Sequence, residues 1–378
     1  MFDVIIPILI FVLILSIVIF VHELGHYIFA VRAGIFVEEF ALGMGPKIFG
    51  FYGKKKSAYP KPEAEDGEYT LYSLRMFPIG GFCKMRGQDE DVPDDPEAMN
   101  NKPVFSRIKV IAGGSIMNFV LAFVLFFALV MLRGFPVAEV TALREDMPGY
   151  NAGLLVGDRI THINGTRVTL YEDFVFMLDT SGGQELDVRV RRGAQTYDFS
   201  ITPVMGEQGN FLIGFRPGRR FGILQERFYD PDFPFYRVGV GEGLVTSAEM
   251  IGFHIRAPFR LLARFIAGQP LPEGGGVMGP IGIGGVITEI YQDVIVHGVL
   301  DTVLTMLFFT ALLSAVLGVM NLLPIPALDG ARLVFLFLEA IRKKPVAPER
   351  EAMVHFVGIV TLLLLAVFIA YRDIARLL

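Results

Sequence analysis

Long apolar runs separated by polar stretches dominate the chain. Four of them reach roughly the 20 residues that a helix needs to cross a bilayer. These runs lie at residues 4–33, 108–132, 299–323 and 354–371. Pro324 and Pro326 follow the third run and should break its helix, which membrane proteins tolerate where the backbone lines a cavity. The pattern predicts a polytopic α-helical membrane protein with about four transmembrane helices.

The loop between the first two runs carries strand patterns. Residues 36–42 and 69–74 are rich in β-forming side chains and are followed by glycines, which predicts a membrane-associated β element. The acidic residues at 89–97 predict a solvated loop.

A separate folded domain is predicted between the second and third runs. Across residues 138–205, short strand patterns alternate with turns around a helical stretch at 171–178, as in a compact α+β domain. The strands are expected at 137–143, 159–163, 186–191 and 196–201. Residues 152–160, with the following Ile163-Asn164-Gly165, resemble the PDZ family in its bacterial circularly permuted form. The resemblance implies a groove that takes an extended peptide, or a peptide C-terminus, by strand addition; a spacer or size filter is the alternative.

Residues 243–268 predict an amphipathic helix. Arg256, Arg260 and Arg264 recur at every fourth position, with Leu, Ile and Phe around them. Such a helix lies at a membrane interface or packs on the inserted domain, and the periodicity does not choose between these two. Residues 279–283, Gly-Pro-Ile-Gly-Ile, predict a turn-rich lead-in to the third run.

Composition narrows the class of protein. The 378 residues are 53% hydrophobic with a mean hydropathy of +0.51, which is too apolar for an ordinary soluble enzyme. The net charge of −5 gives no sign of nucleic-acid binding, and a single cysteine, Cys83, excludes an internal disulfide. The N-terminus lacks a basic segment and a cleavage pattern, so it predicts a transmembrane helix rather than a signal peptide.

Basic side chains set the expected orientation and the segment boundaries. Lysine and arginine gather in the loops after the first and third runs, so both loops are expected in the cytoplasm and the termini outside. The predicted segments are the first transmembrane helix at 1–33, a cytoplasmic loop with the β element at 34–107, the second helix at 108–133, the PDZ-like domain at 134–222, a linker with the amphipathic helix at 223–298, the third helix with its Pro-broken end at 299–330, and a cytoplasmic loop with the fourth helix at 331–378.

The candidate chemistry lies at residues 22–26, His-Glu-Leu-Gly-His, at the end of the first run. Histidines four positions apart share one face of a helix, so His22 and His26 can bind one metal ion. Glu23 between them can act as a base toward water at that metal. Ionisable side chains in a membrane helix are costly, and by default they mark a functional site.

A catalytic zinc site needs a third protein ligand. Asp329 follows the Pro-broken stretch on the same predicted side as the two histidines and is the leading candidate, with His355 as its rival. Asn118 and Asn321 are polar side chains near that side of the membrane, where they could hold a substrate carbonyl or stabilise an oxyanion. The nitrogen, nitrogen and oxygen donor set suits zinc.

These motifs resemble the site-2 protease family of intramembrane zinc metalloproteases, specifically the bacterial regulators of sigma-factor signalling. The resemblance covers nearly the whole chain, because it adds to the PDZ-like domain the segments at 22–26, 40–46, 78–85, 112–118, 279–283 and 321–330. It implies that His22, His26 and Asp329 bind Zn²⁺ and that Glu23 is the catalytic base. It also implies that Asn118 and Asn321 contact substrate. The β element around Gly80 and Gly81 would receive the substrate as an added strand.

The resemblance implies an enzyme of regulated intramembrane proteolysis in a bacterial inner membrane. Its active site would lie near the cytoplasmic side, and its PDZ-like domain in the periplasm. Expected partners are the lipid bilayer and single-pass membrane proteins, such as anti-sigma factors already trimmed by another protease, and remnant signal peptides. The alternative is a membrane metal-binding or transport protein with a peptide-binding domain. A transport protein is expected to carry further ionisable residues inside its other membrane helices. The three later apolar runs contain almost none.

Overall fold

The computed structural model describes residues 2–58, 68–88, 92–206, 209–224, 236–268 and 279–377. It contains two compact units. The first comprises Met1–Ala122 and Met278–Leu378, and the second comprises Phe123–Val277.

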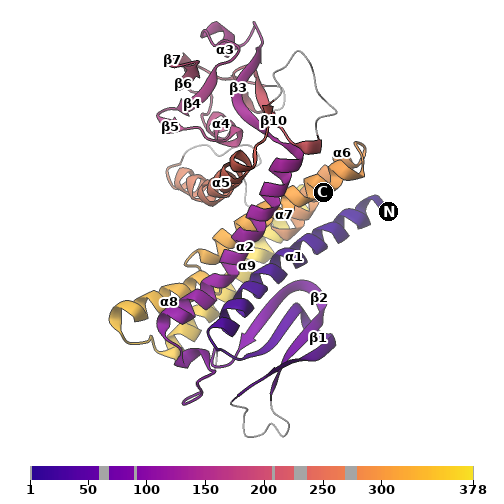
Figure 1. The fold of residues 1–378 in the computed structure, drawn as a ribbon, viewed down its shortest axis with the longest axis vertical. Coiled ribbons are helices and arrows are strands. Elements are labelled where there is room, and N and C mark those ends of the chain that lie inside the picture. Colours follow the sequence, from indigo (N-terminus) through magenta and orange to yellow (C-terminus); the bar gives the residue numbers. More distant parts are fainter. Residues whose placement is uncertain are drawn as a thin grey trace. The chain divides into compact units, whose positions relative to one another are not determined.

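Four long apolar helices confirm the predicted membrane spans (Figure 1). They are α1 (Phe2–Arg32), α2 (Val104–Arg133), α7 (Val299–Leu322) and α9 (Pro348–Leu377). Within the described ranges, these four helices are long and apolar enough to cross a membrane. Their outward side chains are apolar as well, as with Leu9 on α1 and Leu364 on α9, both more than half exposed. Such surfaces suit a lipid environment.

Two further helices occupy segments where the sequence predicted turns or loop. α6 (Pro280–Ile295) replaces the expected turn-rich lead-in, because Pro280 takes the first helical position, where its missing N–H costs nothing. Asp373 of α9 accepts hydrogen bonds from the backbone N–H groups of Gly279 and Gly282 at 3.0 and 2.9 Å, which satisfies the start of α6. α8 (Asp329–Arg342) begins directly after the Pro-broken stretch.

The predicted β element is a pair of long strands, β1 (Val37–Lys56) and β2 (Tyr69–Met85). Both strands bend, so that the first part of β1 lies between two parts of β2. Phe40 of β1 is therefore paired with Cys83 on one side and with Tyr72 on the other. The sheet therefore has an edge formed by residues 81–85, beside residues 37–42. The glycines that predicted strand ends instead bend β1: Gly43 has a φ of +86°, and a Cβ there would lie 2.6 Å from the carbonyl oxygen of Phe77.

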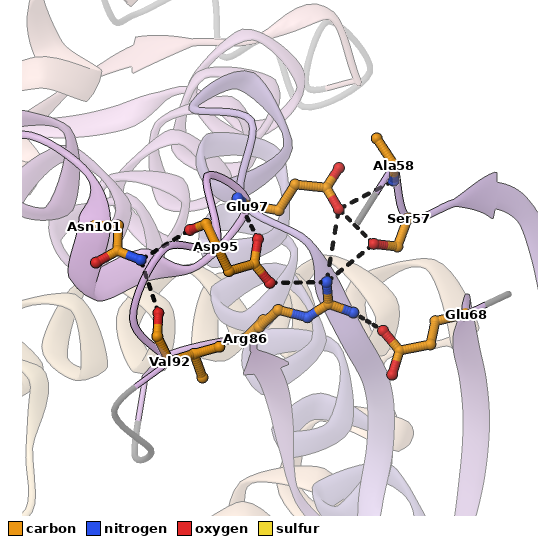
Figure 2. A network of polar contacts seen from close by, with 8 residues as sticks. All are labelled: Ser57, Ala58, Glu68, Arg86, Val92, Asp95, Glu97 and Asn101. Atoms are coloured by element: carbon orange, nitrogen blue, oxygen red, sulfur yellow. Dashed lines mark hydrogen bonds and ion pairs between the residues drawn. The ribbon is translucent and has the colours of Figure 1, made fainter. Parts of the chain in front are cut away.

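A buried arginine ties this sheet to the segment that leads into α2 (Figure 2). Arg86, only 1% exposed, follows the edge of the sheet and pairs with Glu68, Asp95 and Glu97. Its guanidinium also lies over the ring of Phe36. The prediction of a solvated acidic loop is therefore wrong for Asp95 and Glu97, whose charges are turned toward Arg86; residues 89–91 lie outside the described ranges.

The second unit contains the inserted α+β domain. The elements of this unit are β3 (Phe135–Leu143), α3 (Pro148–Asn151), β4 (Arg159–Ile163), β5 (Thr166–Arg167), α4 (Tyr171–Asp179), β6 (Leu186–Arg192), β7 (Gln195–Ile201), β8 (Val204–Met205), β9 (Phe211–Leu212), β10 (Phe215–Phe221), β11 (Tyr236–Arg237) and α5 (Val240–Ile266). The main sheet has the order β11-β10-β3-β4-β6-β7, with β5 paired to β4. The helix predicted at 171–178 is present as α4 and buries Phe174 and Leu178 against the sheet.

All four strands expected in this domain are present, as β3, β4, β6 and β7. β10 was not predicted, and it pairs antiparallel with β3. α5 confirms the helix expected at 243–268. A short 3-10 helix, η1 (Met99–Asn101), lies before α2 in the first unit.

Candidate metal centre

A cleft of about 440 Å³ lies in the first unit. Its walls are α1, the edge of β2, the end of α7, the start of α8 and one face of α9. Glu23, Gly80, Gly81 and Asn321 line it together with the candidate metal ligands. The walls thus come from segments far apart in the sequence.

Three donor atoms converge in this cleft. The Nε2 atoms of His22 and His26 lie 3.2 Å apart, and Asp329 Oδ2 lies 3.0 and 3.2 Å from them. The two imidazoles are buried on one face of α1, as their spacing predicted. Among the described residues, this trio is the group of His, Cys, Asp and Glu side chains able to share a metal ion.

The trio fits zinc. Tetrahedral zinc with bonds of about 2.0–2.1 Å holds its ligand atoms about 3.3 Å apart, close to the three separations here. Two imidazole nitrogens and one carboxylate oxygen are ligands that zinc accepts, and a catalytic site leaves a fourth position open. Asp329 supplies the carboxylate oxygen of this donor set.

The outer nitrogens of both histidines have partners on α2. His26 Nδ1 lies 2.9 Å from the carbonyl oxygen of Val110, an acceptor that fixes the tautomer with Nε2 free to bind metal. His22 Nδ1 lies 3.3 Å from the amide nitrogen of Asn118, while Asn118 Oδ1 is buried without a hydrogen-bond partner among the residues that the structure describes. The two amide ends of asparagine are interchangeable by rotation. With Oδ1 toward His22, Asn118 accepts a hydrogen bond from the Nδ1–H of His22, which leaves the Nε2 lone pair free for metal.

Asn118 and Asn321, both expected to contact substrate, occupy different positions. Asn118 is fully buried behind His22, so its placement favours orienting that ligand, and a substrate contact stays a prediction. Asn321 lines the cleft, with its amide nitrogen 3.4 Å from His22 Nε2. Its placement is compatible with the predicted substrate contact.

The edge of β2 passes directly beside Glu23. A Cβ at Gly81 would lie 3.4 Å from Glu23 Cγ, and the backbone of Cys83 lies within hydrogen-bonding reach of the Glu23 carboxylate. Cys83 itself is buried, and burial raises the pKa of its thiol. Glycine at positions 80 and 81 leaves the backbone open to the cleft.

α9 holds the loop that delivers Asp329. His355 Nδ1 accepts the backbone N–H of Ala327 at 3.1 Å, and Ala327 has a φ of +78°, which is costly for a residue with a side chain. A Cβ at Gly358 would lie 2.1 Å from Pro326 Cβ, so α9 touches the loop there without a side chain. His355 was the rival ligand, but it lies outside the donor trio and contacts the loop instead. Sequence reasoning missed this role because the contact joins two distant segments.

Glycines bring α1 and α2 together at the metal ligands. A Cβ at Gly25 would lie 2.2 Å from the carbonyl oxygen of Gly113, and one at Gly114 would lie 2.5 Å from His26 Nε2. Small residues allow such close helix crossings in membranes. The crossing places the imidazoles against the α2 backbone.

Comparison with known proteins identifies the family of the chain. The model of peptidase family M50, the site-2 proteases, matches residues 10–365. The chain belongs to this family. It is 31% identical to the regulator of sigma-W protease RasP of Bacillus subtilis, over 98% of both chains. It is also 31% identical to the zinc metalloprotease RasP of Bacillus licheniformis, over 98% of this chain and 99% of that one.

Membership of family M50 makes this protein an intramembrane zinc metalloendopeptidase of the site-2 type, as the sequence predicted. A solved PDZ domain of an SdrC-like protein from Listeria innocua is 25% identical, over 21% of this chain and 92% of that one, with a TM-score of 0.20.

Proposed function

We propose that this family M50 protease uses His22, His26 and Asp329 as its zinc ligands and Glu23 as its general base. The observation that carries the proposal is the convergence of the three donor atoms within 3.2 Å of one another, in a cleft that Glu23 also lines. The substrate would be a single-pass membrane protein, cut within or at the cytoplasmic edge of its transmembrane helix.

Each residue of the cleft would have a separate role in peptide hydrolysis. Zinc, when bound, supplies a Lewis acid that lowers the pKa of water at the site to about 7. Glu23 takes a proton from the attacking water and later gives it to the leaving amine. Asn321, which lines the same cleft, would hold the substrate carbonyl. Asn118 and Val110 hold the two imidazoles in the tautomer that binding requires.

The substrate has to reach this site in extended form. Peptide bonds in a helix are shielded by their own hydrogen bonds, so the substrate must unwind and find other partners for its backbone. The edge of β2 at residues 81–85 would supply such partners beside Glu23, and strand addition is a common way to bind a peptide. Gly80 and Gly81 let the added backbone approach closely.

The names of the relatives support the proposed substrate class. The Bacillus subtilis relative is named as a regulator of sigma-W, which supports anti-sigma factors as substrates, with remnant signal peptides as a second group. The chain would act in a bacterial inner membrane, with the metal centre near the cytoplasmic side and the inserted domain in the periplasm. The domain's groove would bind a trimmed peptide end or exclude substrates that still carry a large outer domain.

The first test compares wild type, Glu23→Gln and Glu289→Gln in purified, detergent-solubilised form. Glu289 lies on the exposed side of α6, away from the cleft, and is a matched control for the loss of one carboxylate. We expect Glu23→Gln to keep about one zinc per chain but to lose cleavage of a model transmembrane substrate. Glu289→Gln should keep both. If wild type and Glu23→Gln bind metal equally and neither cleaves any such substrate, the metal-binding or transport alternative replaces this proposal.

A further inference from the structure

The long helix α5 of the second unit has three distinct faces. One face is tied to α4 at both ends of that shorter helix: Arg260 pairs with Asp173 at 3.3 Å, and Arg264 donates to the carbonyl oxygen of Thr180. Between these contacts, the ring of Phe253 meets that of Phe176 edge to face. Asp173 is only 1% exposed, so α5 is fixed to the inserted domain by a buried charge pair.

The second face of α5 packs on the last turns of α2. The His254 ring stacks on Phe126 at 5.5 Å, and Gly243 leaves room for Met131, whose Sδ would lie 2.8 Å from a Cβ there. Phe127 approaches the same glycine. α5 thus joins the inserted domain to the end of a membrane span.

The third face is apolar and exposed. Val245, Phe259, Leu262 and Ile266 are 59, 47, 56 and 76% exposed. They belong to a stripe whose members follow one another at three and four residues, which places them on one side of a helix. The stripe consists of Val245, Ala248, Gly252, Ile255, Phe259, Leu262 and Ile266.

The position at which α5 contacts α2, measured along the axis of α2, indicates what covers this stripe. The apolar stretch of α2 lies between Lys109 and Arg133 and spans roughly 35 Å, close to the thickness of a bilayer core. Phe126 and Met131, where α5 packs, lie about 3–10 Å before Arg133 along the helix axis. Helices that lie in a membrane interface bury their apolar face to a depth of about 5–10 Å. The contacts with α2 therefore hold α5 at the depth of the interface.

We infer that the third face of α5 is embedded in the bilayer interface at the Arg133 end of α2. The sequence left open whether this helix lies on the membrane or on the domain, and separate faces allow it to do both. α4 is one wall of a groove of about 520 Å³, formed with the start of β10. The attachment of α5 to α4 holds that groove near the membrane surface, where it meets segments that emerge from the bilayer.

Because the chain contains no tryptophan, one introduced tryptophan reports on a single position. The test uses full-length protein in liposomes that contain phospholipids with a doxyl quencher near the headgroup. Phe259→Trp probes the stripe, and Leu262→Trp repeats the measurement at a second position. Tyr150→Trp is the matched aromatic control, because Tyr150 lies on the inserted domain and is 47% exposed.

We expect the doxyl lipid to lower the emission of Phe259→Trp and Leu262→Trp by at least about two-fold, since interfacial helices place such side chains among the acyl chains. Tyr150→Trp should respond instead to iodide in the water. Quenching of the two stripe variants by iodide, to the extent seen for Tyr150→Trp, would overturn the inference. Protection from both quenchers would also overturn it, because a protein surface, such as a second copy, would then cover the stripe. Neither result depends on the protease chemistry.

Discussion

Gly114→Ala is the sharpest perturbation of the metal centre, because it adds one methyl group against both imidazoles. The new Cβ would lie 2.5 Å from His26 Nε2 and 2.6 Å from His22 Cε1. Ordinary contact begins near 3.5 Å, so the rings have to move by about 1 Å. Zinc sites accept deviations of only about 0.2 Å in ligand distance. We therefore expect zinc affinity to fall by at least about 100-fold, the upper end of the range for changes that only disturb ligand orientation.

Gly284→Ala is the control for this variant. It makes the same chemical change on α6, but its Cβ would lie 3.5 Å from the Phe11 ring, which is an ordinary contact. Both variants would be purified, dialysed against graded free zinc and assayed for metal content, substrate cleavage and helix content by circular dichroism. Gly284→Ala should match wild type in all three. Wild-type zinc affinity in a Gly114→Ala protein that keeps wild-type helix content would contradict this prediction.

Four further changes test other contacts. Asn118→Ala should weaken zinc binding by about 10- to 100-fold, whereas Asn118→Asp should retain it, because only the latter keeps an acceptor for His22 Nδ1. His355→Leu should lower kcat and zinc affinity together, and His355→Asn should restore both, because its Oδ1 can accept the Ala327 N–H; equal behaviour of the two would contradict the role of His355. Arg86→Met leaves Glu68, Asp95 and Glu97 without their cation and should cost at least about 3 kcal/mol in a denaturation experiment. Burial lowers the pKa of His254 to about 4, below the ordinary 6.5. The unfolded chain therefore takes up a proton at His254 before the folded chain does. The free energy of unfolding should be constant in this respect above pH 6.5 and should fall by up to about 3 kcal/mol as the pH is lowered to 4. Thermal unfolding of His254→Phe should show a flatter dependence on pH over that interval.

Local patterns were enough for some parts of this protein and not for others. The four apolar spans and the His22–His26 spacing are properties of continuous stretches, so the sequence predicts them well. The bend of β1 at Gly43 was not predictable. A glycine in a strand pattern can mark either the end of a strand or a bend within it, and the local sequence is the same in both cases. Asp95 and Glu97 looked solvated for a related reason: their partner, Arg86, is identified only by the tertiary fold.

The metal centre is assembled by close approaches of backbone rather than by bulky packing. The lack of a side chain leaves room for the imidazoles at Gly114, for the carbonyl oxygen of Gly113 at Gly25, and for Pro326 at Gly358. A Cβ at Gly330 would lie 2.0 Å from the carbonyl oxygen of Leu323, so the turn that leads into Asp329 also requires glycine. In a bilayer, apolar side chains gain little by leaving lipid for protein, and close helix contact through small residues supplies the attraction instead. The same contacts that hold the membrane helices together therefore fix the positions of the three donor atoms. For this reason a single methyl group at the crossing should affect catalysis more than the loss of a large side chain on the lipid-facing surface of α9.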